Sequence, residues 1–159
     1  VRVEAECELP LVMGRACRNV APADVPKHLF GLACANDVTA VDLRQRDETL
    51  GRAKGYDTFA PIGPWIETEL GDPASLVLRL LINGQTVQTG ACADMAVGPF
   101  ELVSFISSVM TLLPGDVILA GSPARPCPLA PGDEARVEID GVGVLINPVR
   151  AEGEAAPLQ

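Results

Sequence analysis

The sequence predicts a mainly β, α+β domain with one main helix, and three observations support this. Asn83-Gly84 and Asp140-Gly141 each stand between two apolar runs, which is the strongest short-range signal for a β-hairpin. Residues 99–110 form the best run of apolar side chains at helical spacing. The length of 159 residues suits one domain, and because aromatic residues make up only 4%, aliphatic side chains must fill its core.

The first expected strand, residues 3–13, begins with acidic residues and continues into an apolar run. Glu4, Glu6 and Glu8 lie two residues apart, so on a strand their side chains point to the same face. Carboxylates on one face repel each other, and burying one without a partner is costly. A divalent cation that prefers oxygen ligands would remove this conflict. From this stretch alone, an equally good interpretation is an edge strand with a solvated face, whose charges prevent pairing with another chain.

The other regular elements are assigned from their local patterns. Strands are expected at the apolar runs 30–35, 76–82, 86–91, 117–120, 135–139 and 142–146. The helix at 99–110 has Pro99 at its first position, where a missing N–H costs nothing. Its Leu102, Ile106 and Val109 recur on one face, with Phe105 beside them.

Four segments lack a regular pattern of this kind. Residues 24–29 predict a short helix capped by Asp24. Residues 39–56 are polar and without period, and they predict a long loop of the kind that is often functional. Residues 59–69 contain several Pro and Gly residues and predict an extended, irregular segment. A domain at 1–150 is expected to be followed by a flexible tail at 151–159.

Composition excludes several classes of protein. A formal net charge of −9 argues against a nucleic-acid partner, which would require a basic patch. The five Cys residues are widely spaced, and His28 is the single His, so the paired-ligand spacing of a zinc site is absent. Reduced, mostly buried thiols in a cytoplasmic protein are expected instead. The sequence has no apolar run for a membrane span and no signal-peptide pattern, and its start at Val1, directly in a strand, leads us to expect a missing upstream portion.

Two further residues are candidates for a site together with the acidic strand. Asp37 follows a buried strand, although Asn-Asp there is also ordinary turn chemistry. Lys54 lies in the polar segment 39–56, where a solvated lysine is the commoner case. Spacing alone does not join these residues into one site.

An ordered set of motifs resembles the fumarylacetoacetate hydrolase family. The motifs are Glu6-Cys7-Glu8, Asn36-Asp37-Val38-Thr39-Ala40, Lys54-Gly55-Tyr56-Asp57-Thr58-Phe59, Gly63-Pro64-Trp65, Asn83-Gly84, Asp94-Met95, Pro114-Gly115-Asp116-Val117-Ile118-Leu119, Gly121-Ser122-Pro123 and Gly141-Val142-Gly143. They cover about the whole chain in the family's order. The resemblance implies the family's catalytic domain, with a mixed β-sandwich roll that is usually dimeric, so we expect a homodimer.

The resemblance also implies a set of site residues. Glu6, Glu8 and Asp37 correspond to ligands for Mg²⁺ or Mn²⁺, with Ca²⁺ as a third candidate, while Glu4 falls outside the matched pair and is expected to be a spectator. Lys54 corresponds to the family's catalytic lysine. The residues expected to bind substrate are Arg44, Tyr56, Thr58 and Ser122.

The activity implied by the resemblance is metal-dependent chemistry on small anionic 2-oxo acids or β-diketo acids. Family members cleave, decarboxylate or isomerise such substrates, including the 2-hydroxymuconate-type diacids of aromatic catabolism. All three reactions pass through an enolate, which the metal stabilises as a Lewis acid. Lys54 would add a positive charge close to the same oxygen.

Four departures from the family pattern leave an alternative open. Val41 replaces a common Arg, Arg44 replaces the usual Gln, and residues 124–127 replace a glycine-rich continuation. The fourth departure is that the family's N-terminal portion is absent from this sequence. In hydrolytic members the lid in that portion carries a His and a Glu that activate water. His28 does not match this motif and is expected to be structural. The alternative is therefore a non-catalytic or incomplete member that folds and binds metal without turnover. The sequence upstream of Val1 would discriminate, because a His-containing lid favours hydrolysis.

Overall fold

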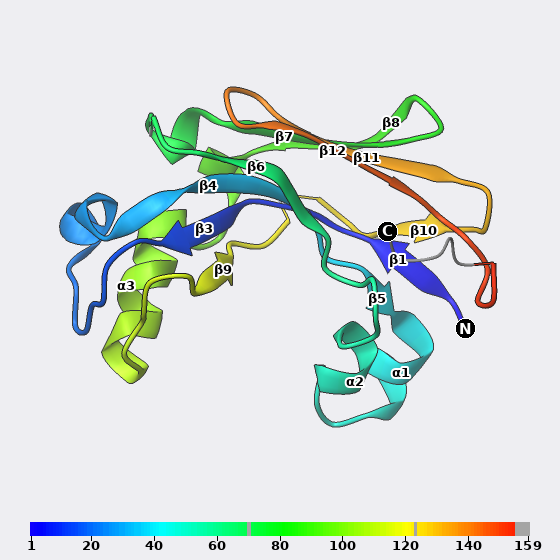
Figure 1. The fold of residues 1–159 in the computed structure, drawn as a ribbon, viewed down its shortest axis with the longest axis horizontal. Coiled ribbons are helices and arrows are strands. Elements are labelled where there is room, and N and C mark those ends of the chain that lie inside the picture. The colour runs from blue at the N-terminus through cyan, green and yellow to red at the C-terminus, as the bar shows by residue number, and fades with distance from the viewer. Residues whose placement is uncertain (70, 123, 155–159) are drawn as a thin grey trace.

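Three antiparallel β-sheets are the main regular structure in the part of the chain that the structure describes (Figure 1). The computed structural model describes residues 1–69, 71–122 and 124–154. Pro123 of the Gly121-Ser122-Pro123 motif and residues 155–159 of the expected tail lie outside this part. The expected fold class, mainly β with one main helix, is confirmed.

The strands form one small sheet and two larger ones. The small sheet has the order β10 (Cys127–Leu129), β1 (Val3–Ala5) and β5 (Thr39–Ala40). The second has the order β2 (Cys7–Glu8), β4 (Leu29–Asn36), β3 (Pro10–Met13) and β9 (Val117–Leu119), with β6 (Ile62–Glu67) also paired to β4. The third has the order β12 (Gly143–Pro148), β11 (Glu134–Ile139), β7 (Val77–Ile82) and β8 (Gln85–Ala91). Side chains from the two larger sheets meet in one aliphatic core, which includes Leu11, Leu32, Leu80 and Val137.

The acidic N-terminal segment is not the single strand that we predicted. It forms β1, β2 and β3, with breaks at Glu6 and Leu9. The first break arises because β1 belongs to the small sheet whereas β2 pairs with β4 in the second sheet. At this crossing the Glu6 N–H donates to Asn36 Oδ1 (3.3 Å), and the Glu6 carbonyl accepts from the Asp37 N–H (2.9 Å). Glu6 therefore lies at the junction of two sheets with both main-chain groups satisfied.

The prediction of a long loop at 39–56 is wrong. The segment contains β5 and two short helices, α1 (Val41–Arg46) and α2 (Gly51–Lys54). Helices this short show no repeating pattern, and they are held by packing of Leu43 and Ala53 with Ala40 and Phe59 rather than by propensity. Lys54 is consequently the last residue of a helix and not a loop residue.

Two other irregular segments also differ from prediction. Residues 59–69 contain β6, which accommodates Pro64 because it pairs on one side only, with β4. The helix expected at 24–29 is a 3₁₀ helix, η1 (Pro22–Lys27), and Asp24 does not cap it but accepts from Lys27 Nζ (2.6 Å). Two further 3₁₀ turns are η2 (Pro73–Ser75) and η3 (Cys92–Asp94).

Both hairpins and the main helix are confirmed. β7 and β8 flank Asn83-Gly84, and β11 and β12 flank Asp140-Gly141. The main helix, α3 (Pro99–Val109), ends one residue before the predicted end, and its fully buried apolar residue is Val103, while Phe105 and Val109 are exposed. None of the helices in the described residues has the length and apolar content of a membrane span. Four of the five cysteines are buried, Cys127 is half-buried, and all five are free thiols.

Candidate functional site

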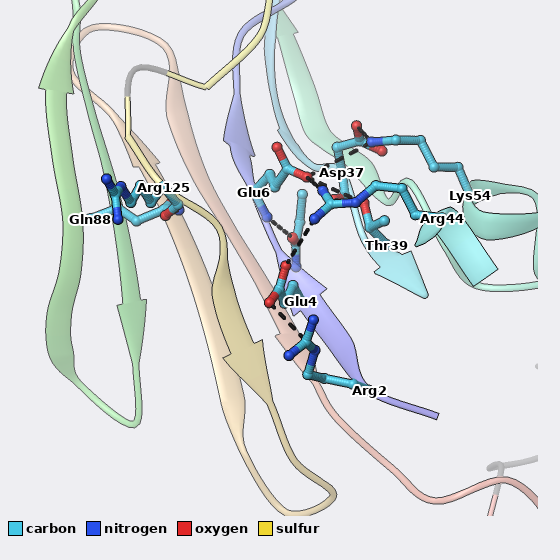
Figure 2. A network of polar contacts seen from close by, with 10 residues as sticks. Arg2, Glu4, Glu6, Asp37, Thr39, Arg44, Lys54, Gln88 and Arg125 are labelled. Carbon is cyan, nitrogen blue, oxygen red and sulfur yellow. Dashed lines mark hydrogen bonds and ion pairs between the residues drawn. The ribbon is translucent and has the colours of Figure 1, made fainter. Parts of the chain in front are cut away.

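Three acidic side chains lie close to the junction between the small sheet and the second sheet. Glu6 lies at the junction, Glu8 in β2, and Asp37 immediately after β4. Glu8 and Asp37 are only 6% and 7% exposed, and Glu6 is half-buried. The expected metal ligands are therefore neighbours in a poorly solvated region, as Figure 2 shows for Glu6 and Asp37.

Burial makes it unfavourable for these carboxyl groups to be charged. It raises the pKa of Glu8 to about 7, and the charges of Asp37 and Glu6 act in the same direction. The Gly121 N–H opposes this shift by donating to Glu8 Oε2 (2.8 Å). Burial is also the main cause that raises the pKa of Glu6. A cation close to this group would reduce the cost of ionising all of its members.

Lys54 places one such cation among the carboxylates. It extends from the end of α2, and its Nζ forms an ion pair and hydrogen bond with Asp37 Oδ2 (Figure 2). The same Nζ lies 4.0 Å from Glu6 Oε1. The structure thus brings together Lys54 and the acidic residues that sequence spacing alone could not join.

Arg44 contributes a second positive charge on the Glu6 side. From α1 its guanidinium lies 4.0 Å from Glu6 Oε1 and 3.8 Å from Glu4 Oε2 (Figure 2). Glu4 in turn lies 3.9 Å from Arg2 Nε. Glu4 therefore links Arg44 to the N-terminal strand, and that it is a spectator for metal binding stays a prediction.

Two polar residues that we did not predict complete the surroundings of Glu6. The Thr39 hydroxyl donates to Glu6 Oε1 (3.3 Å), and Asn36 accepts from the Glu6 N–H. Both are fully buried polar residues in an otherwise apolar stretch. Their sequence signal is that they flank Asp37 in the Asn36-Asp37-Val38-Thr39-Ala40 motif.

The three remaining substrate-binding candidates do not contact the carboxylates. Tyr56 is half exposed, and its ring packs against Phe59 with 5.4 Å between centroids. Thr58 is exposed. Ser122 directly follows Gly121, whose N–H binds Glu8, and its hydroxyl accepts from the Ala124 N–H (3.5 Å). Within the described residues no hydrogen bond joins Tyr56, Thr58 or Ser122 to the acidic group, so their roles remain predictions.

The donor chemistry of the acidic group fits a hard divalent cation. Its side-chain donors are carboxylate oxygens, the ligands that Mg²⁺, Mn²⁺ and Ca²⁺ prefer. A cation would also relieve the mutual repulsion that raises the pKa of Glu8. In the part of the chain that the structure describes, however, no three acidic, His or Cys side chains converge closely enough to ligate one ion. Ligation of one ion by all three carboxylates therefore requires their side chains to turn toward one point.

Comparisons with known proteins point in one direction. The family model described as fumarylacetoacetate (FAA) hydrolase C-terminal matches residues 1–150. A 4-hydroxyphenylacetate degradation bifunctional isomerase/decarboxylase from Salmonella dublin is 38% identical over 153 residues, which are 94% of this chain and 36% of that protein.

Solved structures give the same result. A 5-carboxymethyl-2-hydroxymuconate delta-isomerase from Mycobacterium smegmatis superposes with a TM-score of 0.92 at 42% identity, over 96% of this chain and 61% of that one. A maleylpyruvate hydrolase from Sphingobium sp. SYK-6, in complex with manganese(II) ion and pyruvate, superposes with a TM-score of 0.85 at 36% identity, over 94% and 55%. The expected fold is confirmed. The chain spans about 58% of the length of two of the curated relatives that it matches.

Proposed function

This chain belongs to the fumarylacetoacetate hydrolase family, and from that premise we propose that it is a divalent-metal-dependent enzyme acting on 2-oxo acids or β-diketo acids. The observation that carries the proposal is the grouping of Glu6, Glu8 and Asp37 around the Lys54 ammonium. The relatives named above include an isomerase, a hydrolase and an isomerase/decarboxylase. All three reaction types belong to the proposal, because they share an enolate.

Glu6, Glu8 and Asp37 are the residues that would hold the ion, with Mg²⁺ or Mn²⁺ preferred and Ca²⁺ as a third candidate. When bound, such an ion supplies Lewis-acid polarisation of a keto oxygen. The Sphingobium structure, which contains both manganese(II) and pyruvate, supports this combination of ion and ligand for a relative of the same fold. The Gly121 N–H keeps Glu8 oriented by binding one of its two oxygens.

Lys54 acts on the charge that develops during the reaction. Its Nζ is already held at the acidic group by Asp37 and Glu6, so little reorganisation is needed to bring it to a bound substrate. A fixed ammonium beside the keto oxygen stabilises the negative charge of an enolate more than the neutral ketone. This preference favours cleavage, decarboxylation and tautomerisation alike.

Arg44 would determine which acids bind. Its contacts with Glu4 and Glu6 are long, at 3.8 and 4.0 Å, and the side chain is partly exposed. A substrate carboxylate could therefore form the shorter, bidentate pair that guanidinium groups prefer. We propose that diacids, whose second carboxylate reaches Arg44, are better substrates than simple 2-oxo monoacids.

A second candidate function is a non-catalytic or incomplete family member that folds and binds metal. One observation favours it: the Lys54 ammonium, the proposed catalytic group, is paired with the Asp37 carboxylate. The two candidates make different predictions for turnover and the same prediction for metal binding.

An activity screen with added Mg²⁺ or Mn²⁺ tests the proposal. The panel contains oxaloacetate, acylpyruvates and 2-hydroxymuconate-type diacids, with pyruvate-family monoacids for comparison. We expect metal-dependent turnover of at least one acid, abolished by a chelator and restored by the ion. Metal binding without turnover of any member would favour the non-catalytic candidate, and turnover that survives the chelator would contradict metal dependence.

A further inference from the structure

Gln88 is a buried amide on a strand that otherwise faces mostly outward. It lies in the middle of β8 and is 5% exposed, whereas Gln85, Thr86 and Val87 on the same strand are exposed. A buried amide is costly unless its donor and acceptor are both satisfied. The partners of this side chain therefore explain why Gln is present.

Both partners of Gln88 lie in segments that build the candidate site. Its Oε1 accepts from the Cys7 N–H (3.2 Å). Its Nε2 donates to the Arg125 carbonyl, and Figure 2 shows these two residues side by side. Cys7 stands between the two proposed ligands Glu6 and Glu8. Arg125 belongs to the segment that follows Ser122. One side chain from the third sheet thus connects the ligand strand with the loop that carries a substrate-binding candidate.

The same loop is tied to the ligand strand at its other end. The Ala120 N–H donates to the Leu9 carbonyl (3.0 Å), and the Gly121 N–H donates to Glu8 Oε2 (2.8 Å). Gly121 and Arg125 are thus each held by a hydrogen bond, the first to Glu8 and the second to Gln88. Without the Gln88 amide, the buried Cys7 N–H would lose its acceptor. The Arg125 carbonyl would lose its donor, while the hydrogen bond from Gly121 to Glu8 would stay.

We propose that Gln88 is a positioning residue for the active site: it fixes the main chain between Glu6 and Glu8 and fixes the loop of Ser122. The proposal rests on the function proposed above. Gln is suited to this role because it offers an acceptor and a donor at once. An ionised Glu keeps the acceptor for Cys7 but has no donor for Arg125, and Met keeps the length but has neither.

The first test compares Gln88→Met with Gln85→Met, which makes the same change on the same strand at an exposed position. Removing a group that orients metal ligands typically weakens metal binding roughly 10–100-fold. We expect calorimetry to give that loss of Mn²⁺ affinity for Gln88→Met and wild-type affinity for Gln85→Met. Equal, wild-type affinities in two folded variants would overturn the proposal.

The second test separates the two contacts and covers the case in which Gln88→Met does not fold. At about pH 8, where Glu is ordinarily ionised, Gln88→Glu should bind Mn²⁺ within a few-fold of wild type. Pyruvate binding to the Mn²⁺-loaded variant should be about tenfold weaker, because the loop has lost its anchor. Wild-type pyruvate affinity would overturn the loop half of the proposal.

Hydrogen exchange of the Cys7 amide distinguishes failure of this inference from failure of the proposed function. Wild-type protein that binds no Mn²⁺ would contradict the proposed function alone. In that case we still expect the Cys7 amide to exchange at least about tenfold faster in Gln88→Met than in Gln85→Met. Unchanged exchange would overturn the role of Gln88 whatever the metal result.

Discussion

At the scale of single residues, Lys54 decides the charge balance of the acidic group. It neutralises Asp37 and lies near Glu6, so in the absence of an ion it acts as the counter-charge of two proposed ligands. A divalent ion and the ammonium therefore repel each other at the same carboxylates. Catalysis and metal affinity should respond to its removal in opposite directions.

Lys54→Met tests this balance, because it keeps the apolar stem and removes the charge. We expect Mn²⁺ affinity to be unchanged or higher, since a competing cation is gone. Turnover should fall on the order of 10²–10³-fold, as for the loss of a preorganised charge partner. The matched control is Arg52→Met, which removes a charge of the same helix that pairs with half-buried Asp47. Wild-type turnover and metal binding in Lys54→Met would place Lys54 outside the mechanism.

Glu8 gives the metal-free protein a characteristic pH dependence. Its pKa is raised from an ordinary value near 4.5 to about 7, so between these values the folded protein holds a proton that the unfolded chain has released. The contribution of Glu8 to stability is therefore full below about pH 4.5 and declines as the pH rises toward 7. The shift corresponds to a decline on the order of 3 kcal/mol in the free energy of unfolding.

Urea unfolding in the presence of a chelator measures this decline. The Gln side chain of Glu8→Gln cannot ionise, so this variant should lose the part of the decline in unfolding free energy with pH that Glu8 causes. The control Glu134→Gln, at an exposed position, should show the same decline as wild type. Added Mn²⁺ should also flatten the slope, because a bound ion favours the ionised carboxylate. The same slope in Glu8→Gln as in wild type would show that Glu8 is not the titrating group.

At the scale of elements, local signals were read correctly and non-local ones were missed. The two hairpins were predicted because their turn residues carry the required backbone geometry in the dipeptide itself. The break at Glu6 in the predicted strand 3–13 was not predicted, because it depends on which sheet each half of the segment joins. α1 and α2 were missed because six and four residues are too few to repeat a helical pattern.

In the candidate site, too, residues in local motifs could be predicted from the sequence and residues that act through contacts between sheets could not. Glu6, Glu8, Asp37 and Lys54 were found because they lie in recognisable motifs. Gln88 could not be found from the sequence, since its importance depends on a main-chain N–H that β8 approaches from another sheet. The contact of Glu4 with Arg44 was missed for a related reason: Arg44 was placed in a loop rather than on a helix that faces β1.

The pairing of β4 with β6 gives a prediction at this scale. Gly31 in β4 lies so close to β6 that a methyl group there would collide with the Glu67 carbonyl and the Ile66 side chain. Because a main-chain atom cannot move cheaply, Gly31→Ala should lower the free energy of unfolding by about 1–3 kcal/mol. Gly51→Ala, at the start of α2 with open space around it, is the control and should not be destabilising. Equal stability of both variants in urea would contradict the close packing of these strands.

At the scale of the whole molecule, one apolar face has no cover within the described residues. It comprises exposed side chains on α3 and the segment that follows it, namely Phe105, Val109, Met110, Leu113 and Val117. Contiguous exposed apolar surface of this kind usually marks an interface. A homodimer remains our prediction, with this face as its centre.

Light scattering of the protein at micromolar concentration tests the prediction. We expect the mass of a dimer for wild type and for Thr86→Glu, which adds a charge at an exposed position of β8. Phe105→Glu should shift the protein toward monomer, because a charge would be buried without a partner. A wild-type monomer would contradict the prediction.

The central claim is that Glu6, Glu8 and Asp37 form a site for one divalent ion. Calorimetric titration of Mn²⁺ into wild type, Glu8→Ala and the exposed control Glu134→Ala tests it most directly, since it requires no knowledge of the substrate. We predict one bound ion in wild type and in Glu134→Ala, and a loss of at least about tenfold in affinity for Glu8→Ala because a ligand oxygen has been removed. Unchanged Mn²⁺ affinity in Glu8→Ala, or no binding in wild type, would contradict the claim.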